Sequence, residues 1–222
     1  MTRASGVREL RRGQIVEAAR GLVAERGLDA LTFAALEQVL GFTRGVITWH
    51  FRDKDEVVRA VFDDAVAAID RTVLAAVRAE ATPTDRVRAV VREMVRGWLG
   101  ATDAGAVLVA YWGRLGSDLD LARLNAALYG RYREATAELV RSGQARGAFD
   151  PHVDADTVAG LLVSLVIGVG LQASFERAAG SDRFALEQAV DEAGEWVVRA
   201  LSARGAHEEG GVARPDAPRA DP

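Results

Sequence analysis

The sequence predicts an all-α protein, and three observations support this fold class. The 222-residue chain has only five prolines and is rich in the good helix formers Ala, Leu, Arg and Glu. No stretch shows the sustained alternation of apolar and polar residues that marks a half-buried strand. Apolar residues recur instead at three- and four-residue spacing, between Gly, Asp and Pro signals. With 49% of its residues hydrophobic, the chain can bury a substantial core.

The first sixty residues predict three short helices and the start of a fourth. The first helix spans about 7–26 and ends at Gly27, a residue that favours helix termination. Thr32 stands where an N-cap belongs for a second helix, which ends at Leu40 before Gly41. Thr43 is expected to cap a third helix that carries three apolar residues on its inner side: Val46, Ile47 and Phe51.

The rest of the chain predicts a longer set of helices. Asp53 can cap a fourth helix with an apolar stripe that begins at Val57. Beyond Pro83 the breaks predict helices over 84–101, 104–116, 118–146, 154–179 and 183–203. We therefore divide the chain into a first domain, 1–55, a helical domain, 56–204, and a tail, 205–222. The tail is rich in Gly, Pro and charge, so disorder is expected there.

Composition narrows the classes of function. The chain has no cysteine and three histidines, so disulfides and thiolate metal sites are excluded and no cofactor or metal is expected. An enzyme would need a nucleophile–base pair or clustered carboxylates, and the sequence offers neither. The N-terminus lacks the apolar core of a signal peptide, so a cytoplasmic protein is expected. The net charge is −4, but residues 1–60 are mildly basic, which permits nucleic-acid binding by the first domain.

One segment invites a membrane interpretation. Residues 157–175 form a run of nineteen residues without a charge, close to the length that spans a bilayer. The run contains Thr, Ser and Gln. A buried helix is therefore favoured over a membrane span, and no membrane partner is expected.

The spacing in the first domain predicts a helix-turn-helix. Leu36 and Leu40 face inward from the second helix, Gly41 allows a sharp turn, and Ile47 points back from the third helix. The outward face of the third helix then carries the donors of Thr43, Arg44, Thr48 and Trp49. Hydroxyl, guanidinium and indole groups all donate to phosphate oxygens, and arginine also reads guanine. Taken singly, Arg44 is typical of a solvated surface arginine, and Trp49 of a packing residue. The caps, the turn glycine and the donor face together favour DNA binding.

Residues 12–62 resemble the TetR/AcrR family of bacterial one-component regulators. The resemblance is carried by Gly27, Thr32, the Gly-Phe-Thr stretch at 41–43, Gly45 and the His50-Phe51 pair, followed by Lys54. The region after Pro83 looks like the ligand-binding half of BetI-like members, more loosely. The resemblance implies that Thr32, Gly45, His50 and Lys54 join the donor face in binding DNA, although His50 by itself fits a half-buried structural histidine.

This chain departs from the family pattern at the proposed DNA surface. Thr48 stands where the family usually has a tyrosine that contacts phosphate. Glu37 stands where a small residue is usual, and Ala34 and Ala35 replace residues that are often polar. The alternative function is therefore a helical dimer of this type that has weakened or lost DNA binding and acts through protein contacts.

The helical domain is expected to sense a small molecule and to dimerise. Its aromatic residues are consistent with two alternatives: packing in an ordinary core, or lining of a ligand pocket. The candidate ligand-binding residues are Trp98, Tyr111, Trp112, Arg114, Asn125, Tyr129 and Gln172. An aromatic cluster of this kind could hold a quaternary ammonium by cation–π attraction, as the BetI-like resemblance suggests. The apolar excess of 154–179 and 183–203 predicts a four-helix bundle across the two-fold axis of a homodimer.

The predicted function is a ligand-responsive regulator, most simply a repressor. Two copies of the third helix would enter successive major grooves of a palindromic operator about 34–36 Å apart. Ligand binding in the helical domain would change that spacing, so that DNA and ligand disfavour each other.

Overall fold

The computed structural model describes residues 3–99, 104–181 and 183–202. In these residues the chain forms nine α-helices, one 3₁₀ helix and no strand, which confirms the all-α prediction. In order, the elements are α1 (Arg3–Arg26), η1 (Leu28–Ala30), α2 (Phe33–Leu40), α3 (Arg44–His50), α4 (Lys54–Ala79), α5 (Pro83–Leu99), α6 (Ala104–Trp112), α7 (Leu119–Ala145), α8 (Ala155–Ala178) and α9 (Leu186–Leu201). We call α1–α3 the head and α4–α9 the body.

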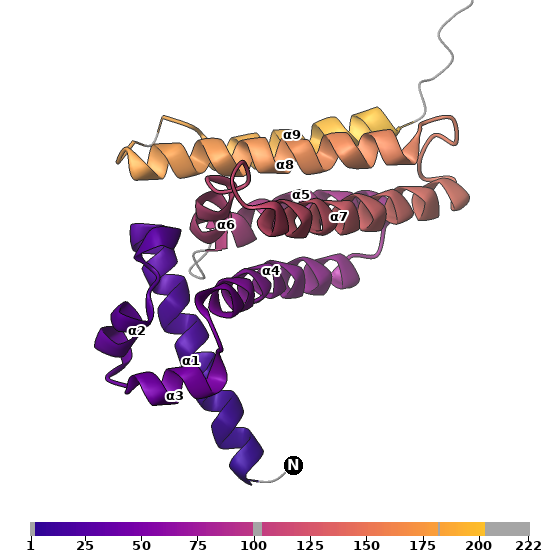
Figure 1. Ribbon diagram of the computed structural model, residues 1–222. Coiled ribbons are helices and arrows are strands. Elements are labelled where there is room, and N and C mark those ends of the chain that lie inside the picture. Colours follow the sequence, from indigo (N-terminus) through magenta and orange to yellow (C-terminus); the bar gives the residue numbers. More distant parts are fainter. Residues whose placement is uncertain (1–2, 100–103, 182, 203–222) are drawn as a thin grey trace, which may run out of the picture.

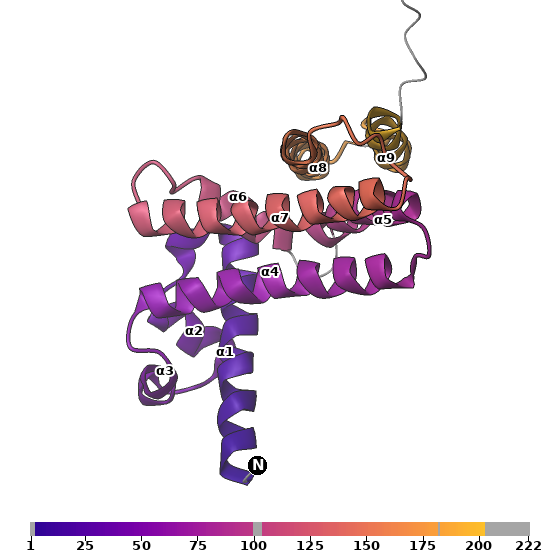
Figure 2. The same cartoon turned by 90° about the vertical axis from the view of Figure 1, so that its right-hand side faces the viewer.

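The body is a stack of three helical layers. Figure 1 shows α4 on the side of the head, α5 and α7 in the middle with α6, and α8 with α9 on the far side. In the view turned by 90°, α8 and α9 are seen end-on and side by side, on the side of α5 and α7 that faces away from α4 (Figure 2). Helix α4 contacts both α1 and α5, so it joins the head to the body.

Side-chain caps begin the helices that frame the head. The hydroxyl of Thr32 accepts a hydrogen bond from the backbone of Ala35 at 3.1 Å, and Asp53 accepts from Glu56 at 2.8 Å. Both caps satisfy backbone donors that the first turn leaves unpaired, and both were predicted. The same arrangement begins α7 and α8, at Asp118 and Asp154.

Two predictions about the head are wrong in detail. Thr43 occupies the N-cap position of α3 with an extended backbone, but its side chain makes no capping hydrogen bond. Val46 is 39% exposed and does not anchor α3. Gly41 does end α2 as expected, with a φ of 65° that glycine adopts without strain.

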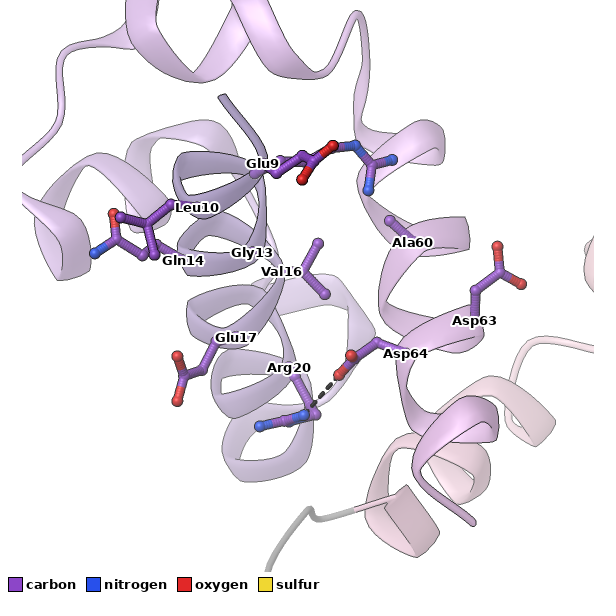
Figure 3. A pocket seen from close by; sticks show the side chains of 11 residues that line it. Glu9, Leu10, Gly13, Gln14, Val16, Glu17, Arg20, Ala60, Asp63 and Asp64 are labelled. Carbon is purple, nitrogen blue, oxygen red and sulfur yellow. Dashed lines mark hydrogen bonds and ion pairs between the residues drawn. The ribbon is translucent and has the colours of Figure 1, made fainter. Parts of the chain in front are cut away.

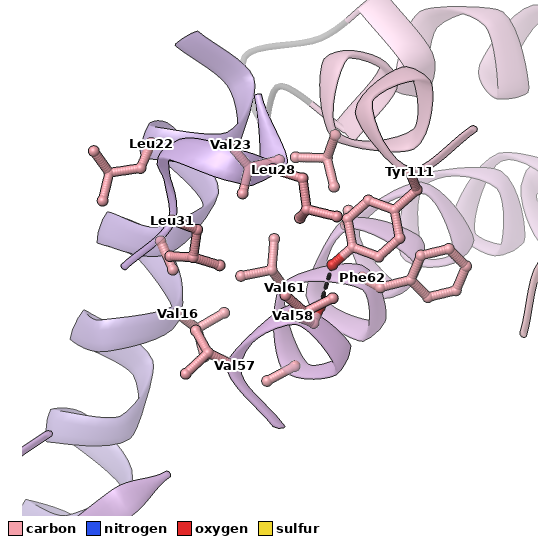
Figure 4. Close-up of a cluster of buried hydrophobic side chains, with 14 of the residues drawn as sticks. Val16, Leu22, Val23, Leu28, Leu31, Val57, Val58, Val61, Phe62 and Tyr111 are labelled. Atoms are coloured by element: carbon pink, nitrogen blue, oxygen red, sulfur yellow. Dashed lines mark hydrogen bonds between the residues drawn. The ribbon is translucent and has the colours of Figure 1, made fainter. Parts of the chain in front are cut away.

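A single hydrophobic cluster runs from the head into the body. Ile15, Leu36 and Ile47 are fully buried in the same cluster as Val57 of α4 and Tyr111 of α6. Figure 4 shows part of it, with the Tyr111 hydroxyl donating to the backbone carbonyl of Val58. The predicted domain boundary between residues 55 and 56 falls in the first turn of α4, where the packing is continuous. The predicted tail, 205–222, lies outside the described residues.

A second cluster holds the body together. It joins α5, α7, α8 and α9 through buried residues such as Val87, Val140, Leu162 and Leu201. Of the three glycines of α8, only Gly170 lies so close to another helix that a larger side chain would be crowded. A Cβ on Gly170 would lie 3.0 Å from Cγ of Trp98, whereas a Cβ on Gly168 would meet nothing within 4 Å.

Helix α8 is the one helix, among the residues that the structure describes, that is long and apolar enough to cross a membrane by length and composition. The expectation of a buried helix holds for one face only, because 39% of its apolar window is buried. The other face carries Leu161 and Phe175, which are 53% and 59% exposed. The reason is its position at the edge of the stack, where no helix among the described residues covers it.

Candidate functional site

The exposed face of α3 is held outward by a buried inner face. Ile47 and Phe51 are fully buried against α1 and α2, so the helix is fixed on the head by its inner side. Arg44, Thr48 and Trp49 are exposed on the outer side, as predicted. The indole of Trp49 is 63% exposed, an unusual position for so large an apolar group.

The hydroxyl of Thr48 is already engaged within its own helix. It donates to the carbonyl oxygen of Arg44 at 3.0 Å and lies 3.3 Å from that of Gly45. Phosphate oxygens only accept hydrogen bonds, and a threonine hydroxyl has a single proton. Thr48 can therefore contact phosphate only after it gives up this internal bond. The guanidinium of Arg44 lies over the ring of Phe33, and the residue is exposed.

His50 lies beneath this face and not on it. The side chain is buried, and its Nδ1 atom has no hydrogen-bond partner among the described residues. Trp49 packs edge-on against it, with ring centroids 4.6 Å apart. Burial, and then the nearby charges of Arg8 and Arg12, lower the pKa of His50 below its ordinary value of 6.5. The histidine expected among the DNA-binding residues is thus a neutral packing residue.

The other residues of the predicted DNA surface have mixed positions. Thr32 uses its side-chain oxygen to cap α2, as described above, and Thr43 is exposed. Gly45 is exposed, and the nearest atom to an added Cβ would be Oγ1 of Thr43 at 3.9 Å, so space does not demand glycine. Lys54 is half-buried at the start of α4.

Sequence reasoning missed three arginines of α1 that lie against the helix-turn-helix. The guanidinium carbons of Arg8, Arg11 and Arg12 lie 4.8, 4.7 and 4.6 Å from aromatic ring centroids. The rings belong, in that order, to Trp49, Phe42 and Phe51. The run RELRR was visible in the sequence, but only the crossing of α1 and α3 shows what the arginines contact.

The body contains a cavity of about 280 Å³ between α4, α5 and α7. Its walls are largely apolar, and the main lining residues are Val73, Leu74, Val77, Val90, Met94 and Leu139. Tyr132 also lines it, and its buried hydroxyl has no hydrogen-bond partner in the described structure. Burial raises the pKa of Tyr132, so it is a neutral hydrogen-bond donor. Asp70 and Arg131 also line the cavity, as an ion pair 3.8 Å apart.

None of the seven predicted ligand-binding residues lines this cavity. Trp98 donates its indole N–H to Ser174 at 3.0 Å, and Trp112 donates to Asn125 at 3.1 Å. Their polar atoms are therefore satisfied inside the protein, as in an ordinary aromatic core. Tyr129 packs between Trp112 and Tyr132 and reaches the edge of the cavity only through Tyr132.

Two more of the predicted ligand residues lie elsewhere. Arg114 forms an ion pair with Asp29 and so links the body to the head. Gln172 is exposed on the outer face of α8, in a shallow groove that it shares with Trp196 of α9. The hydroxyl of Tyr111 donates to the backbone carbonyl of Val58. All three residues lie away from the cavity because the packing of their helices directs them to other contacts.

A wider groove of about 850 Å³ lies between α1 and α4. Figure 3 shows Val16 of α1 and Ala60 of α4 facing one another across it, with the Arg20–Asp64 ion pair closing one end. That pair has an N–O distance of 2.6 Å. Both signs of charge line the groove, so it marks the junction of head and body and does not select one class of ligand.

Comparison with known proteins identifies the two halves of the chain. Residues 15–61 match the model described as "Bacterial regulatory proteins, tetR family". Residues 83–202, more than half of the chain, match the model described as "BetI-type transcriptional repressor, C-terminal".

This chain belongs to the TetR family. The prediction made from the residues around the helix-turn-helix is confirmed, and so is the BetI-like character of the second half. TetR-family proteins are regulators of transcription, and the helix-turn-helix of the head is their DNA-binding part.

Among curated TetR-family relatives, the transcriptional regulator TtgR of Pseudomonas putida is 44% identical over 52 residues, which cover 23% of this chain and 25% of TtgR. BetI of Burkholderia ambifaria is 30% identical over 123 residues, which cover 54% of this chain and 62% of BetI. The chain thus spans between a quarter and about three fifths of these relatives.

Solved TetR-type structures share the fold over nearly the whole chain. A putative transcriptional regulator from Saccharomonospora viridis, in complex with choline, covers 88% of this chain and 100% of its own with a TM-score of 0.72 and 24% identity. A TetR-family regulator from Cytophaga hutchinsonii covers 89% and 98% with a TM-score of 0.74 and 18% identity. At these identities the likeness shows the fold.

Proposed function

We propose that this TetR-family protein is a cytoplasmic repressor, and not an enzyme, that binds a palindromic operator as a homodimer and is released by a small-molecule effector. The observation that carries the proposal is the two-sided α3. Ile47 is fully buried on one side, while Arg44 and Trp49 present donors to solvent on the other. A helix held this way after a tight turn can lie in a major groove with its donors toward bases and phosphates.

The homodimer is supported by the uncovered apolar surface of α8 and α9. Leu161 and Phe175 of α8 and Trp196 of α9 are each more than half exposed. A second copy that packs its own α8 and α9 against them would complete a four-helix bundle. The contact would be isologous, which suits a palindromic operator.

The effector is proposed to bind in the cavity between α4, α5 and α7. An apolar wall with one unpaired buried donor fits a small organic molecule. The ring of Tyr132 favours a cationic group there, and the carboxylate of Asp70 can accept such a group in exchange for Arg131, its ion-pair partner. The choline bound to the Saccharomonospora protein makes a quaternary ammonium the first compound to test.

The test measures binding of the purified protein to the DNA upstream of its own gene. We expect Arg44→Ala/Lys54→Ala to weaken binding at least about tenfold, because a lost base contact and a lost phosphate contact both lower affinity. Arg146→Ala/Arg183→Ala is the control, since it removes equal charge from exposed positions on the body. Equal affinity of the two double variants would overturn the assignment of these contacts.

The alternative is a dimer that acts through protein contacts only. It is favoured by Thr48, whose hydroxyl proton is bound within α3, and by Glu37, a half-buried residue that adds a negative charge to α2. Salt separates the two functions, because operator binding must weaken steeply as ionic strength rises. A protein that shows no footprint on its upstream DNA even at low salt is the adaptor and not the repressor.

A further inference from the structure

Helix α1 extends beyond the head on the side away from the body. It begins at Arg3, four residues before the predicted start. Figures 1 and 2 show its N-terminal end projecting past α3, on the side opposite to α8 and α9. Residues 6–13 are exposed and contribute no side chain to the buried core. Burial of apolar side chains therefore does not explain a helix of this length.

Arginines of this extension lie beside the exposed face of α3. Arg8 lies over the ring of Trp49, the most exposed aromatic residue of α3. Arg11 lies over Phe42, in the turn between α2 and α3. A guanidinium over a ring keeps N–H donors at its edges, where they match the oxygens of a phosphate.

Both guanidinium groups carry uncompensated charge. Within the described part of the chain, neither Arg8 nor Arg11 forms an ion pair; Arg11 gives a single hydrogen bond to Gln14 at 3.0 Å. The stacked rings restrict the side chains, so a phosphate contact would cost less conformational entropy than one made by a free arginine.

The helix-turn-helix itself is poor in cations. Arg44 is the only arginine of α2 and α3, Lys54 follows at the start of α4, and Glu37 adds a negative charge. DNA affinity depends on neutralised phosphates. If the head binds DNA, most of the positive charge at the DNA surface must therefore come from residues outside α2 and α3.

We propose that the N-terminal turns of α1 form a second DNA-contacting element, in which Arg8 and Arg11 bind backbone phosphates beside the groove that receives α3. This inference rests on the proposed DNA binding. Arg12 is not included, because it lies over the buried ring of Phe51 and so positions α1 on the head.

The experiment compares the full-length protein with three variants on its upstream DNA, by fluorescence anisotropy between about 50 and 200 mM salt. Arg8→Ala/Arg11→Ala removes the proposed contacts. Arg8→Lys/Arg11→Lys keeps the charge and weakens the stacking. Arg26→Ala is the matched control, because Arg26 is an exposed arginine at the opposite end of the same helix.

The alanine pair is expected to weaken binding about tenfold or more and to lower the slope of log affinity against log salt by about one for each lost contact. Non-specific DNA should lose affinity by the same factor, since phosphates carry no sequence. The lysine pair should keep most of the slope. Hydroxyl-radical footprints should lose protection only at the outer edges of each half-site.

The outcomes separate this inference from the proposed function. If the wild type binds and Arg8→Ala/Arg11→Ala retains the affinity and slope of Arg26→Ala, the α1 contacts are excluded while DNA binding stands. If the lysine pair loses as much affinity as the alanine pair, and both melt at lower temperature, the arginines support the fold by stacking and the inference is wrong. If the wild type binds no DNA, the proposed function fails first.

Discussion

Single residues at the head show how burial changes a side chain's role. His50 follows directly after an exposed tryptophan, yet its ring is buried with one nitrogen unpaired. The sequence suggested Thr48 as a phosphate donor, but its hydroxyl is bound to the helix backbone. In both residues the chemical type was correct for a DNA contact, and the local geometry directs the polar group elsewhere.

The lowered pKa of His50 predicts a dependence of stability on pH. The pKa of His50 is 6.5 in the unfolded chain and lower in the folded chain. Below pH 6.5 the unfolded chain therefore takes up a proton that the folded chain does not. The contribution of neutral His50 to the free energy of unfolding is complete above pH 6.5 and is lost as the pH falls below it. We expect the free energy of unfolding to fall more between about pH 7.5 and about pH 5 for the wild type than for His50→Phe. Denaturant titrations at both pH values measure it. Equal losses would show that His50 titrates normally.

At the scale of elements, α8 presents apolar side chains on two opposite faces. One face of α8 packs on α5 and α7, and Ala159 and Leu162 there are fully buried. The opposite face carries Leu161 and Phe175, which the same chain leaves exposed. The proposed dimer would cover the second face and so account for the apolar composition of residues 157–175.

The exposed face predicts the effect of charge on assembly. We expect Leu161→Glu/Phe175→Glu to convert a dimer into a monomer, because carboxylates at the centre of an apolar interface would be desolvated without partners. Sedimentation velocity measures the mass. Leu119→Glu is the control, since Leu119 is 64% exposed at the start of α7. A wild type that sediments as a monomer, or a double variant that stays dimeric, would contradict the proposed interface.

At the scale of the whole molecule, the head and body are linked at several points. The Tyr111 hydroxyl binds the Val58 carbonyl, Arg114 pairs with Asp29, and one hydrophobic cluster passes through α4 and α6. The cavity adjoins the same α4. A ligand that displaces α4 would therefore also displace the head, and this link would couple the proposed effector to the proposed DNA binding.

This arrangement predicts that filling the cavity abolishes effector binding. Choline is expected to raise the melting temperature of the wild type by mass action and to weaken its DNA binding. Met94→Trp, which places a larger side chain in the cavity wall, should remove both effects. Circular dichroism shows whether the variant is folded. No response of the wild type would exclude choline-like cations, and an unchanged response of a folded variant would move the site elsewhere.

Much of the fold follows from local sequence. The caps at Thr32 and Asp53, the turn at Gly41 and the inward side of α3 at Ile47 were predicted because each depends on residues within a few positions. Helix ends were less well predicted. The helix expected over 104–116 ends at Trp112, because the next residues form turns.

The candidate site was predicted only in part. The face of Arg44, Thr48 and Trp49 was found because a short helix with one buried side fixes its own outer side. The cavity was missed because its lining comes from three helices, and its most informative residue, Tyr132, differs in the sequence from other tyrosines in no visible way. The candidate residue Gln172 was misplaced because α8 turns it outward.

The sequence by itself determined that this protein is helical, where most helices lie, and that its first sixty residues carry a helix-turn-helix of the TetR type. The helices and the helix-turn-helix follow from capping, turns and periodicity, which act over one or two helical turns, and the TetR type follows from the resemblance of residues 12–62 to that family. Only the tertiary structure decided that the indole N–H of Trp98 donates to Ser174, that Arg114 forms an ion pair with Asp29, and that Arg8 lies over the ring of Trp49. Each of these contacts joins residues far apart in the chain, so each depends on how the helices pack.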